Sequence, residues 1–273
     1  MAQGKRVEEK SRLSTFFTKR TIILILILAA GAILRLYSLN TVPPGFHRDE
    51  ALFGYDAYSL LKTGHDQHGR FLPLSFEGFG ISEYPMAFYL KVPFIALMGL
   101  NVFSVRFSVV FISIITIFLI YKLAKRFFQD EATALLCTFV AAFSSWHFFM
   151  SRPGYSIGMY GLMFLLLGTY LIFGKTRRQT VIGGICLGLT CFSYAAYFFF
   201  LPLFLPLVFG LFWKELKTDK NKRWGIATAF LVMLLAFAVF WLPNLKRAPQ
   251  AAFWADDARG ILFQWSDKPV GEI

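Results

Sequence analysis

The densest group of reactive side chains in this sequence lies between residues 47 and 56, which read HRDEALFGYD. A carboxylate here can take a proton from an attacking hydroxyl group, and a guanidinium group can bind phosphate through paired hydrogen bonds. Asp49 and Glu50 also suit the first turn of a helix, where negative charge meets the positive end of the helix dipole. The stretch is therefore either an acidic helix start at an interface or the carboxylate part of an active site.

The overall composition indicates a membrane protein. Hydrophobic residues make up 56% of the sequence and charged residues 16%, and the mean hydropathy is +0.56, whereas soluble proteins are about 45–50% apolar and about 25% charged. Apolar runs such as 105–121 and 226–242 approach or reach the roughly 17–25 residues that cross a bilayer as a helix. The sequence predicts an all-α polytopic membrane protein.

The net charge of +12 does not indicate a nucleic-acid partner. Nucleic-acid binding needs lysines and arginines gathered on one soluble face, and here they separate apolar runs. The three cysteines, Cys137, Cys186 and Cys191, fall inside predicted spans without metal-ligand spacing, which indicates small core residues.

The positions of the basic residues predict how the chain crosses the bilayer. Residues 1–20 carry six basic and two acidic residues, which places a basic N terminus in the cytoplasm. A first span covers about 21–39, and an outer loop covers 40–104. Within this loop we expect a juxtamembrane helix at 85–100, because this piece is short and contains Lys91, and because a crossing there would put the later basic clusters outside.

The remaining apolar runs continue this alternation. We expect a second span at 105–121, a third to about 149, a fourth to 173, two short spans from 180–213 divided at Ser193–Tyr197, and a seventh that ends near Pro243. Residues 21–243 then form one transmembrane domain of about seven helices. Residues 244–273 begin a further outer loop.

This topology brings scattered polar residues to the outer interface. The sequence has no phosphate-binding glycine loop, no nucleophile elbow and no C-x-x-C pair, so a cytoplasmic nucleotide site is not indicated. Carboxylates near arginines on the outer face suit a substrate that carries phosphate on a lipid. The expected site residues are His47, Asp49, Glu50, Tyr84, Lys91, Arg106, Arg152 and Tyr194.

The sequence around these residues also resembles a known family. The segments PPGFHRDEALFGYD, YPMAFYLKVP and GLNVFSVRFS are similar to the first outer loop and second span of the bacterial protein-mannosyltransferase-like membrane glycosyltransferases. These enzymes belong to the GT-C superfamily, together with the aminoarabinose transferases. The resemblance runs from about residue 29 to the end of the chain. Because relatives are considerably longer, we expect this chain to be an N-terminal fragment.

The resemblance implies a glycosyltransferase of the cell membrane whose active site is on the outer face. It would move a sugar from a polyprenyl-phosphate carrier, usually with inversion, to a glycan, lipid or protein acceptor. Asp49 resembles the general base and Glu50 its supporting partner. Arg106 is similar to the arginine that heads the second span, and Arg152 to a polar residue of the next outer loop. We expect both arginines to hold the carrier phosphate.

Several alternatives stay open. Many relatives have a Lys-Pro-Pro run where this chain reads Glu83-Tyr84-Pro85, and a carboxylate there would repel phosphate unless Lys91 takes over. A non-catalytic scaffold of the same fold, or a transporter of lipid-linked glycans, is therefore the rival reading. No cofactor is expected, although His47, His65 or His68 with Asp49 or Glu50 could bind a divalent metal. Arg35 is expected to reach toward the lipid headgroups as an anchor.

Overall fold

The computed structural model describes residues 19–79, 81–211 and 217–240. The expected cytoplasmic N terminus up to residue 18 and the expected outer loop from residue 244 lie outside these residues. In the described part the regular structure is almost entirely helical, as the composition predicts. The α-helices are α2 (Lys19–Leu36), α3 (Arg48–Thr63), α4 (Met86–Met98), α5 (Val102–Phe128), α6 (Glu131–Phe143), α7 (Ser145–Ser151), α8 (Ile157–Ile172), α9 (Arg177–Leu189), α10 (Ala196–Leu211) and α12 (Lys220–Phe240).

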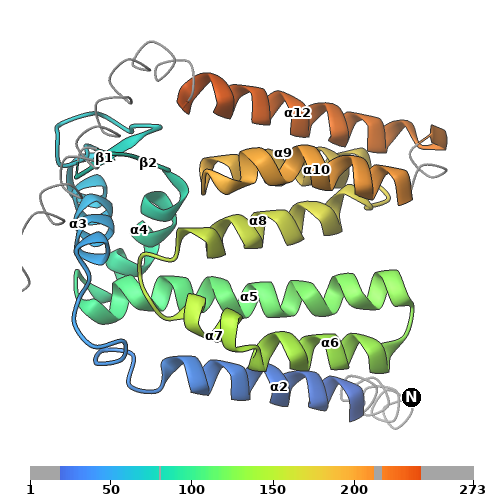
Figure 1. The fold of residues 1–273 in the computed structure, drawn as a ribbon, viewed down its shortest axis with the longest axis horizontal. Coiled ribbons are helices and arrows are strands. Elements are labelled where there is room, and N and C mark those ends of the chain that lie inside the picture. Colours follow the sequence, from blue (N-terminus) through green and yellow to red (C-terminus); the bar gives the residue numbers. More distant parts are fainter. Residues whose placement is uncertain (1–18, 80, 212–216, 241–273) are drawn as a thin grey trace, which may run out of the picture.

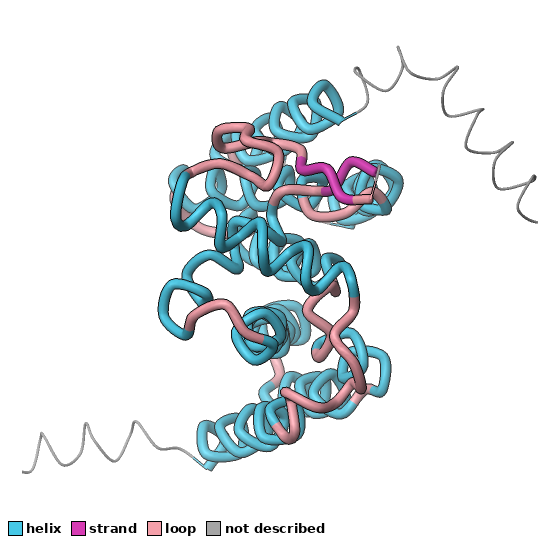
Figure 2. The backbone as a smooth tube through the Cα atoms, turned by 90° about the vertical axis from the view of Figure 1, so that its left-hand side faces the viewer, coloured by secondary structure: helices cyan, strands magenta, loops and turns pink. Residues whose placement is uncertain are grey.

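Most of these helices form a bundle along the long axis of the molecule. Helices α2, α5, α6, α8, α9, α10 and α12 run along this axis, and α3 lies across the end opposite Lys19 (Figure 1). The same end carries α4 and the two antiparallel strands β1 (Phe76–Gly78) and β2 (Ile81–Glu83). We call α3, β1, β2 and α4 the cap. Figure 2 shows the molecule from the cap end, with the two strands in the upper part of the view.

Two described helices, α5 and α12, are long and apolar enough to cross a membrane. The pair α6 and α7, bent by 55°, makes a third if it is one span. The described part therefore contains two or three spans by length and apolarity, and the seven-span prediction is not established. Helix α4 has 13 residues, which at 1.5 Å per residue is about 20 Å and shorter than the hydrocarbon core of about 30 Å.

The long apolar run 180–213 is broken where the sequence predicts a division. Helix α9 ends at Leu189, a 3-10 helix, η1, covers Thr190–Phe192, and α10 begins at Ala196. Small residues let α9 pack closely on both sides. A Cβ atom on Gly184 would lie 2.0 Å from the Gly225 carbonyl oxygen in α12, and one on Gly183 would lie 2.6 Å from the Ile172 nitrogen in α8.

An aromatic core fixes the cap. The buried rings of Phe76 in β1 and Phe88 in α4 stack at 3.9 Å between centroids, and Phe53 of α3 meets Phe88 edge-on at 4.7 Å. These rings belong to the same buried cluster as Val109 of α5 and Tyr160 of α8. Large aromatic side chains contribute much of the stability of such cores. The cap is therefore held against α5 and α8, and α3 has a defined position.

Candidate active site on the cap

The first turn of α3 is built around the buried carboxylate of Glu50. This side chain is 1% exposed. Its Oε1 accepts hydrogen bonds from Arg106 Nε at 2.9 Å and from the Gly154 nitrogen at 2.6 Å, and its Oε2 accepts from Arg106 Nη2 and the His47 nitrogen, both at 3.0 Å. Burial acts to raise the pKa of Glu50, but these hydrogen bonds outweigh it and hold the pKa below its ordinary value. Glu50 is therefore an ionised anchor that joins three segments.

Arg106 also holds the loop between α2 and α3. Its Nη1 donates to the carbonyl oxygens of Leu39 and Pro43, both at 3.0 Å, and its Nη2 donates to that of Gly45. The side chain is fully buried. Its donors are thus occupied by Glu50 and by the loop, and in this structure no face of the guanidinium group is open to a carrier phosphate.

Arg152 binds the same loop from the other side. Its Nη1 donates to the carbonyl oxygens of Leu34 and Arg35 at 3.0 and 3.2 Å, and its Nη2 donates to those of Tyr37 and Val42, both at 2.8 Å. Only 5% of the residue is exposed. The two arginines expected to bind phosphate therefore hold the backbone that leads into Asp49.

Asp49 itself is more accessible, with 33% of its side chain exposed. Its Oδ2 lies 3.4 Å from His47 Nδ1, and its Oδ1 lies 3.6 Å from Nε of the exposed Arg48. Helix α3 begins with a capping box, in which His47 Nδ1 accepts from the Asp49 nitrogen while Glu50 accepts from the His47 nitrogen. This explains why the sequence HRDE starts a helix and why Asp49 and Glu50 point to different surroundings.

Glu83 lies at the end of β2, and its carboxyl group interacts electrostatically with that of Asp49. Burial, and then the charge of nearby Asp49, raise the pKa of Glu83 from 4.5 to about 7. The sequence alone indicated only that Glu83 would repel a phosphate. The structure adds that it lies near enough to Asp49 for the negative charge of Asp49 to raise its pKa.

The other expected site residues make their contacts with side chains other than Asp49. Lys91 is fully buried in α4 and donates to the Tyr160 hydroxyl at 2.7 Å and to Ser108 Oγ at 3.4 Å. The ring of Tyr84 packs on Phe240, with 4.6 Å between centroids. Tyr194 is 43% exposed and lines a separate, largely apolar hollow of about 270 Å³.

His47 makes one contact that the sequence did not predict. Its ring lies 4.8 Å from that of Tyr155, centroid to centroid. Tyr155 follows Gly154, the donor to Glu50. The segment 152–155 therefore contacts the α3 start through Gly154 and Tyr155, and the loop before it through Arg152. No residue pattern in this segment indicates these contacts before the chain is folded.

The prediction for Arg35 is wrong. Its side chain is fully buried and donates from Nη1 to the carbonyl oxygens of Gly31 and Ala142, both at 2.9 Å, with Nη2 at 3.0 Å from His147 Nδ1. His147 Nε2 in turn lies 2.8 Å from the Thr116 hydroxyl. Polar partners inside the bundle hold both terminal nitrogens of the guanidinium group, so the side chain is directed into the bundle and not toward the headgroups. Of the cysteines, Cys186 and Cys191 are buried as expected, and Cys137 is half-buried.

Among the described residues no group of three or more His, Cys, Asp or Glu side chains could hold a metal ion. His65 and His68 lie in the loop after α3, where Asp66 accepts from the nitrogens of His68 and Arg70 and from Arg70 Nε. This acidic turn is occupied by its own neighbours. The alternative of a metal site with Asp49 therefore has no support in the geometry.

Comparison with known proteins agrees with the resemblance in the sequence. A family model described as dolichyl-phosphate-mannose-protein mannosyltransferase matches residues 82–242. Two similar curated proteins are undecaprenyl phosphate-alpha-4-amino-4-deoxy-L-arabinose arabinosyl transferases of Pseudomonas aeruginosa (strain UCBPP-PA14) and Pseudomonas paraeruginosa (strain DSM 24068 / PA7). They are 27% and 26% identical over 212 residues. Each alignment covers 76% of this chain and 37% of the relative.

The alignments thus span little more than a third of the length of these curated relatives. The family match begins within β2 and includes Glu83, Lys91, Arg106 and Arg152, whereas Asp49 and Glu50 precede it. It covers more than half of the chain. This membrane protein therefore belongs to the dolichyl-phosphate-mannose-protein mannosyltransferase family.

Proposed function

We propose that this chain forms the catalytic cap and membrane core of a glycosyltransferase that takes a sugar from a polyprenyl-phosphate carrier. Family membership and the similar arabinosyl transferases support this class of reaction. The active site would face the outside of the cytoplasmic membrane, with the amino terminus in the cytoplasm. The acceptor would present a hydroxyl group.

Asp49 is the proposed general base. This assignment rests on the contrast between the two carboxylates in the first turn of α3. Glu50 is buried and accepts several hydrogen bonds, whereas Asp49 is partly exposed and can meet a substrate. In an inverting displacement Asp49 would take the proton of the acceptor hydroxyl as its oxygen attacks the anomeric carbon. The bond from that carbon to the phosphate oxygen breaks, and the phosphate leaves with the carrier.

The proposal gives Arg106 and Arg152 a different role from the one expected from sequence. Both guanidinium groups are buried in hydrogen bonds to the loop before α3. A phosphate would have to displace these partners, leaving buried carbonyl groups without donors and, for Arg106, the Glu50 carboxylate without its guanidinium partner. We therefore assign both arginines as positioning residues that hold Asp49 in place.

Sugar transfer by an Asp49→Asn variant tests the proposal. The protein would be expressed from its complete reading frame, purified from membranes, and assayed with a panel of polyprenyl-phosphate sugars. Loss of a general base typically lowers the rate by about 10²–10⁴-fold, and we expect a loss in this range with unchanged membrane insertion.

Asp130→Asn is the matched control for this experiment. Asp130 caps α6 at the end of the bundle away from the cap, and Asn can also accept the hydrogen bond of an N-cap. This variant should keep wild-type transfer. Full activity of Asp49→Asn would remove Asp49 from the mechanism. A wild-type protein that inserts correctly but transfers no sugar from any donor in the panel would favour the non-catalytic scaffold.

A further inference from the structure

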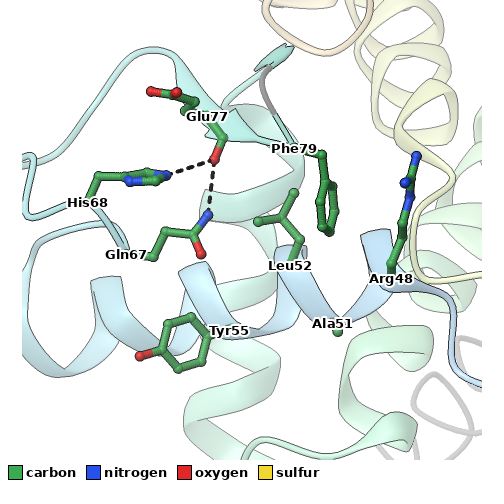
Figure 3. A pocket seen from close by; sticks show the side chains of 8 residues that line it. All are labelled: Arg48, Ala51, Leu52, Tyr55, Gln67, His68, Glu77 and Phe79. Carbon is green, nitrogen blue, oxygen red and sulfur yellow. Dashed lines mark hydrogen bonds between the residues drawn. The ribbon is translucent and has the colours of Figure 1, made fainter.

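A cavity on the cap lies along the outward face of α3. It has a volume of about 610 Å³, within the range of roughly 300–1,000 Å³ that is usual for small-molecule sites. Figure 3 shows its walls, with Ala51 and Leu52 of α3 between Phe79 and Arg48 on one side and Tyr55, Gln67 and His68 on the other. No role was assigned to this hollow by the sequence or by the proposed mechanism.

Two aromatic rings that line this hollow are exposed to solvent. Tyr55 is 53% exposed and Phe79 is 57% exposed, and Leu52 is buried between them. Aromatic rings offer flat apolar faces, and a sugar ring has a matching face of C–H groups. Two such rings around one hollow, with polar groups beside them, differ from isolated apolar residues on a surface, which need no explanation.

The polar groups of the hollow are held in fixed orientations. Gln67 Nε2 donates to the Glu77 carbonyl oxygen at 3.0 Å, and His68 Nε2 lies 3.3 Å from the same oxygen. Since a carbonyl only accepts, His68 carries its hydrogen on Nε2 in this contact. The Gln67 amide oxygen points away from Glu77 (Figure 3) and can accept a hydrogen bond from a ligand.

The charge of the hollow indicates an uncharged ligand. Arg48 and Glu77 contribute one charge of each sign, and the Arg48 guanidinium lies 4.8 Å from the centre of the Phe79 ring. A site for a phosphate or carboxylate would carry excess positive charge. Aromatic faces, amide and imidazole groups and balanced charge fit a neutral molecule with many hydroxyl groups.

The hollow also adjoins the proposed base. Arg48 lies in its wall and, at the same time, its Nε is 3.6 Å from the Asp49 carboxylate. The lining residues Arg48, Leu52 and Tyr55 follow helical spacing, so they form one stripe of α3, and Asp49 borders this stripe at its N-terminal end. A ligand in the hollow could thus extend one hydroxyl group past Arg48 toward Asp49.

We propose that this hollow is the acceptor subsite and that the acceptor is a neutral saccharide. The assignment rests on the proposed function, since it concerns the substrate whose hydroxyl group Asp49 would deprotonate. It selects a glycan from the three acceptor classes that the family resemblance leaves open. Tyr55 and Phe79 would stack on the sugar rings, and Gln67 and His68 would bind their hydroxyl groups.

Equilibrium binding without a donor tests this assignment. Saturation-transfer NMR on the purified full protein in nanodiscs would use three probes, the neutral trisaccharides of mannose, glucose and N-acetylglucosamine. We expect at least one of these trisaccharides to bind with a dissociation constant of about 10 mM or lower. Tyr55→Ala should weaken that binding by tenfold or more. Tyr37→Ala is the matched control, because Tyr37 is 75% exposed at the end of α2 and does not line the hollow.

The outcomes separate this inference from the proposed function. Failure of all three probes to bind, or equal binding by Tyr55→Ala and wild type, overturns the saccharide subsite. Binding of a Ser/Thr-rich peptide that depends on Tyr55, in place of the sugars, overturns it too. Asp49→Asn should bind the saccharide normally. If Asp49→Asn retained transfer while Tyr55→Ala lost saccharide binding, the base assignment would fail and the subsite would stand.

Discussion

Arg106→Met is the most informative single change, because the structure and the sequence assign different roles to this arginine. Methionine keeps much of the length and apolar volume of the side chain but removes all of its donors. The Glu50 carboxylate would lose both of its bonds to Arg106, and the carbonyl groups of Leu39, Pro43 and Gly45 would lose theirs. Glu50 would keep only the two backbone donors from His47 and Gly154.

The expected cost follows from the burial of the pair, which is 0% exposed at Arg106 and 1% at Glu50. Removing one partner of a buried ion pair costs about 3–5 kcal/mol, because the other charge is left uncompensated. At about 2–4 °C per kcal/mol for chains of 150–250 residues, we expect the melting temperature to fall by about 10 °C. If Arg106 instead bound only substrate, removing it would leave the stability of the free protein almost unchanged.

The assay is thermal unfolding of the purified protein in detergent, without substrate. Arg48→Met is the matched control, since 70% of its side chain is exposed and exposed substitutions change the free energy of unfolding by about 0.5 kcal/mol or less. The double variant Glu50→Leu/Arg106→Leu should be more stable than Arg106→Met, because it leaves no unpaired charge in the core.

Equal melting temperatures of Arg106→Met and Arg48→Met would refute the positioning role. Such a result, accompanied by a raised KM for the lipid-linked sugar, would restore the phosphate contact expected from sequence. A large loss of stability with rescue in the double variant would confirm that Arg106 acts through Glu50 and the loop.

Three further predictions concern the surroundings of Asp49. Burial and the charge of Asp49 raise the pKa of Glu83 to about 7, so the folded state holds an extra proton between about pH 4.5 and 7. The melting temperature of the wild type should therefore fall as pH rises through this window. Glu83→Gln should flatten that fall, whereas Glu77→Gln, whose side chain is 55% exposed, should not. Gly154→Ala should lower both melting temperature and transfer, because its Cβ would lie 2.7 Å from Val105 Cγ1 and 3.2 Å from Glu50 Oε1, whereas Gly158→Ala meets nothing within 4 Å and should change neither. In a background without native cysteines, a membrane-impermeant maleimide should label Ser82→Cys in intact cells and Lys175→Cys only after lysis; the reverse pattern would contradict the proposed topology.

The local sequence determined the secondary-structure elements and the types of reactive side chain that they carry. Apolar runs predicted a helical membrane protein, the residues HRDE predicted an acidic helix start, and Ser193–Tyr197 predicted a break. Each of these predictions depends only on residues close together in the sequence. A capping box involves four consecutive residues, and the apolar pattern of a helix is contained in one continuous segment. The family resemblance followed in the same way, because its motifs are short continuous stretches.

The partners of the charged residues were decided only by the tertiary structure. Position near a span end suggested that Arg35 would anchor at the headgroups and that Arg106 and Arg152 would bind phosphate, yet all three are buried. Each of them makes hydrogen bonds to residues more than sixty positions away, such as Arg35 to Ala142, Arg106 to Leu39 and Arg152 to Leu34. A buried guanidinium group must find acceptors, and which acceptors come within reach depends on how α2, α5 and the segment after α7 pack together. No local pattern encodes that packing, which is why the burial and the hydrogen-bond partners of the three arginines could not be predicted from the sequence.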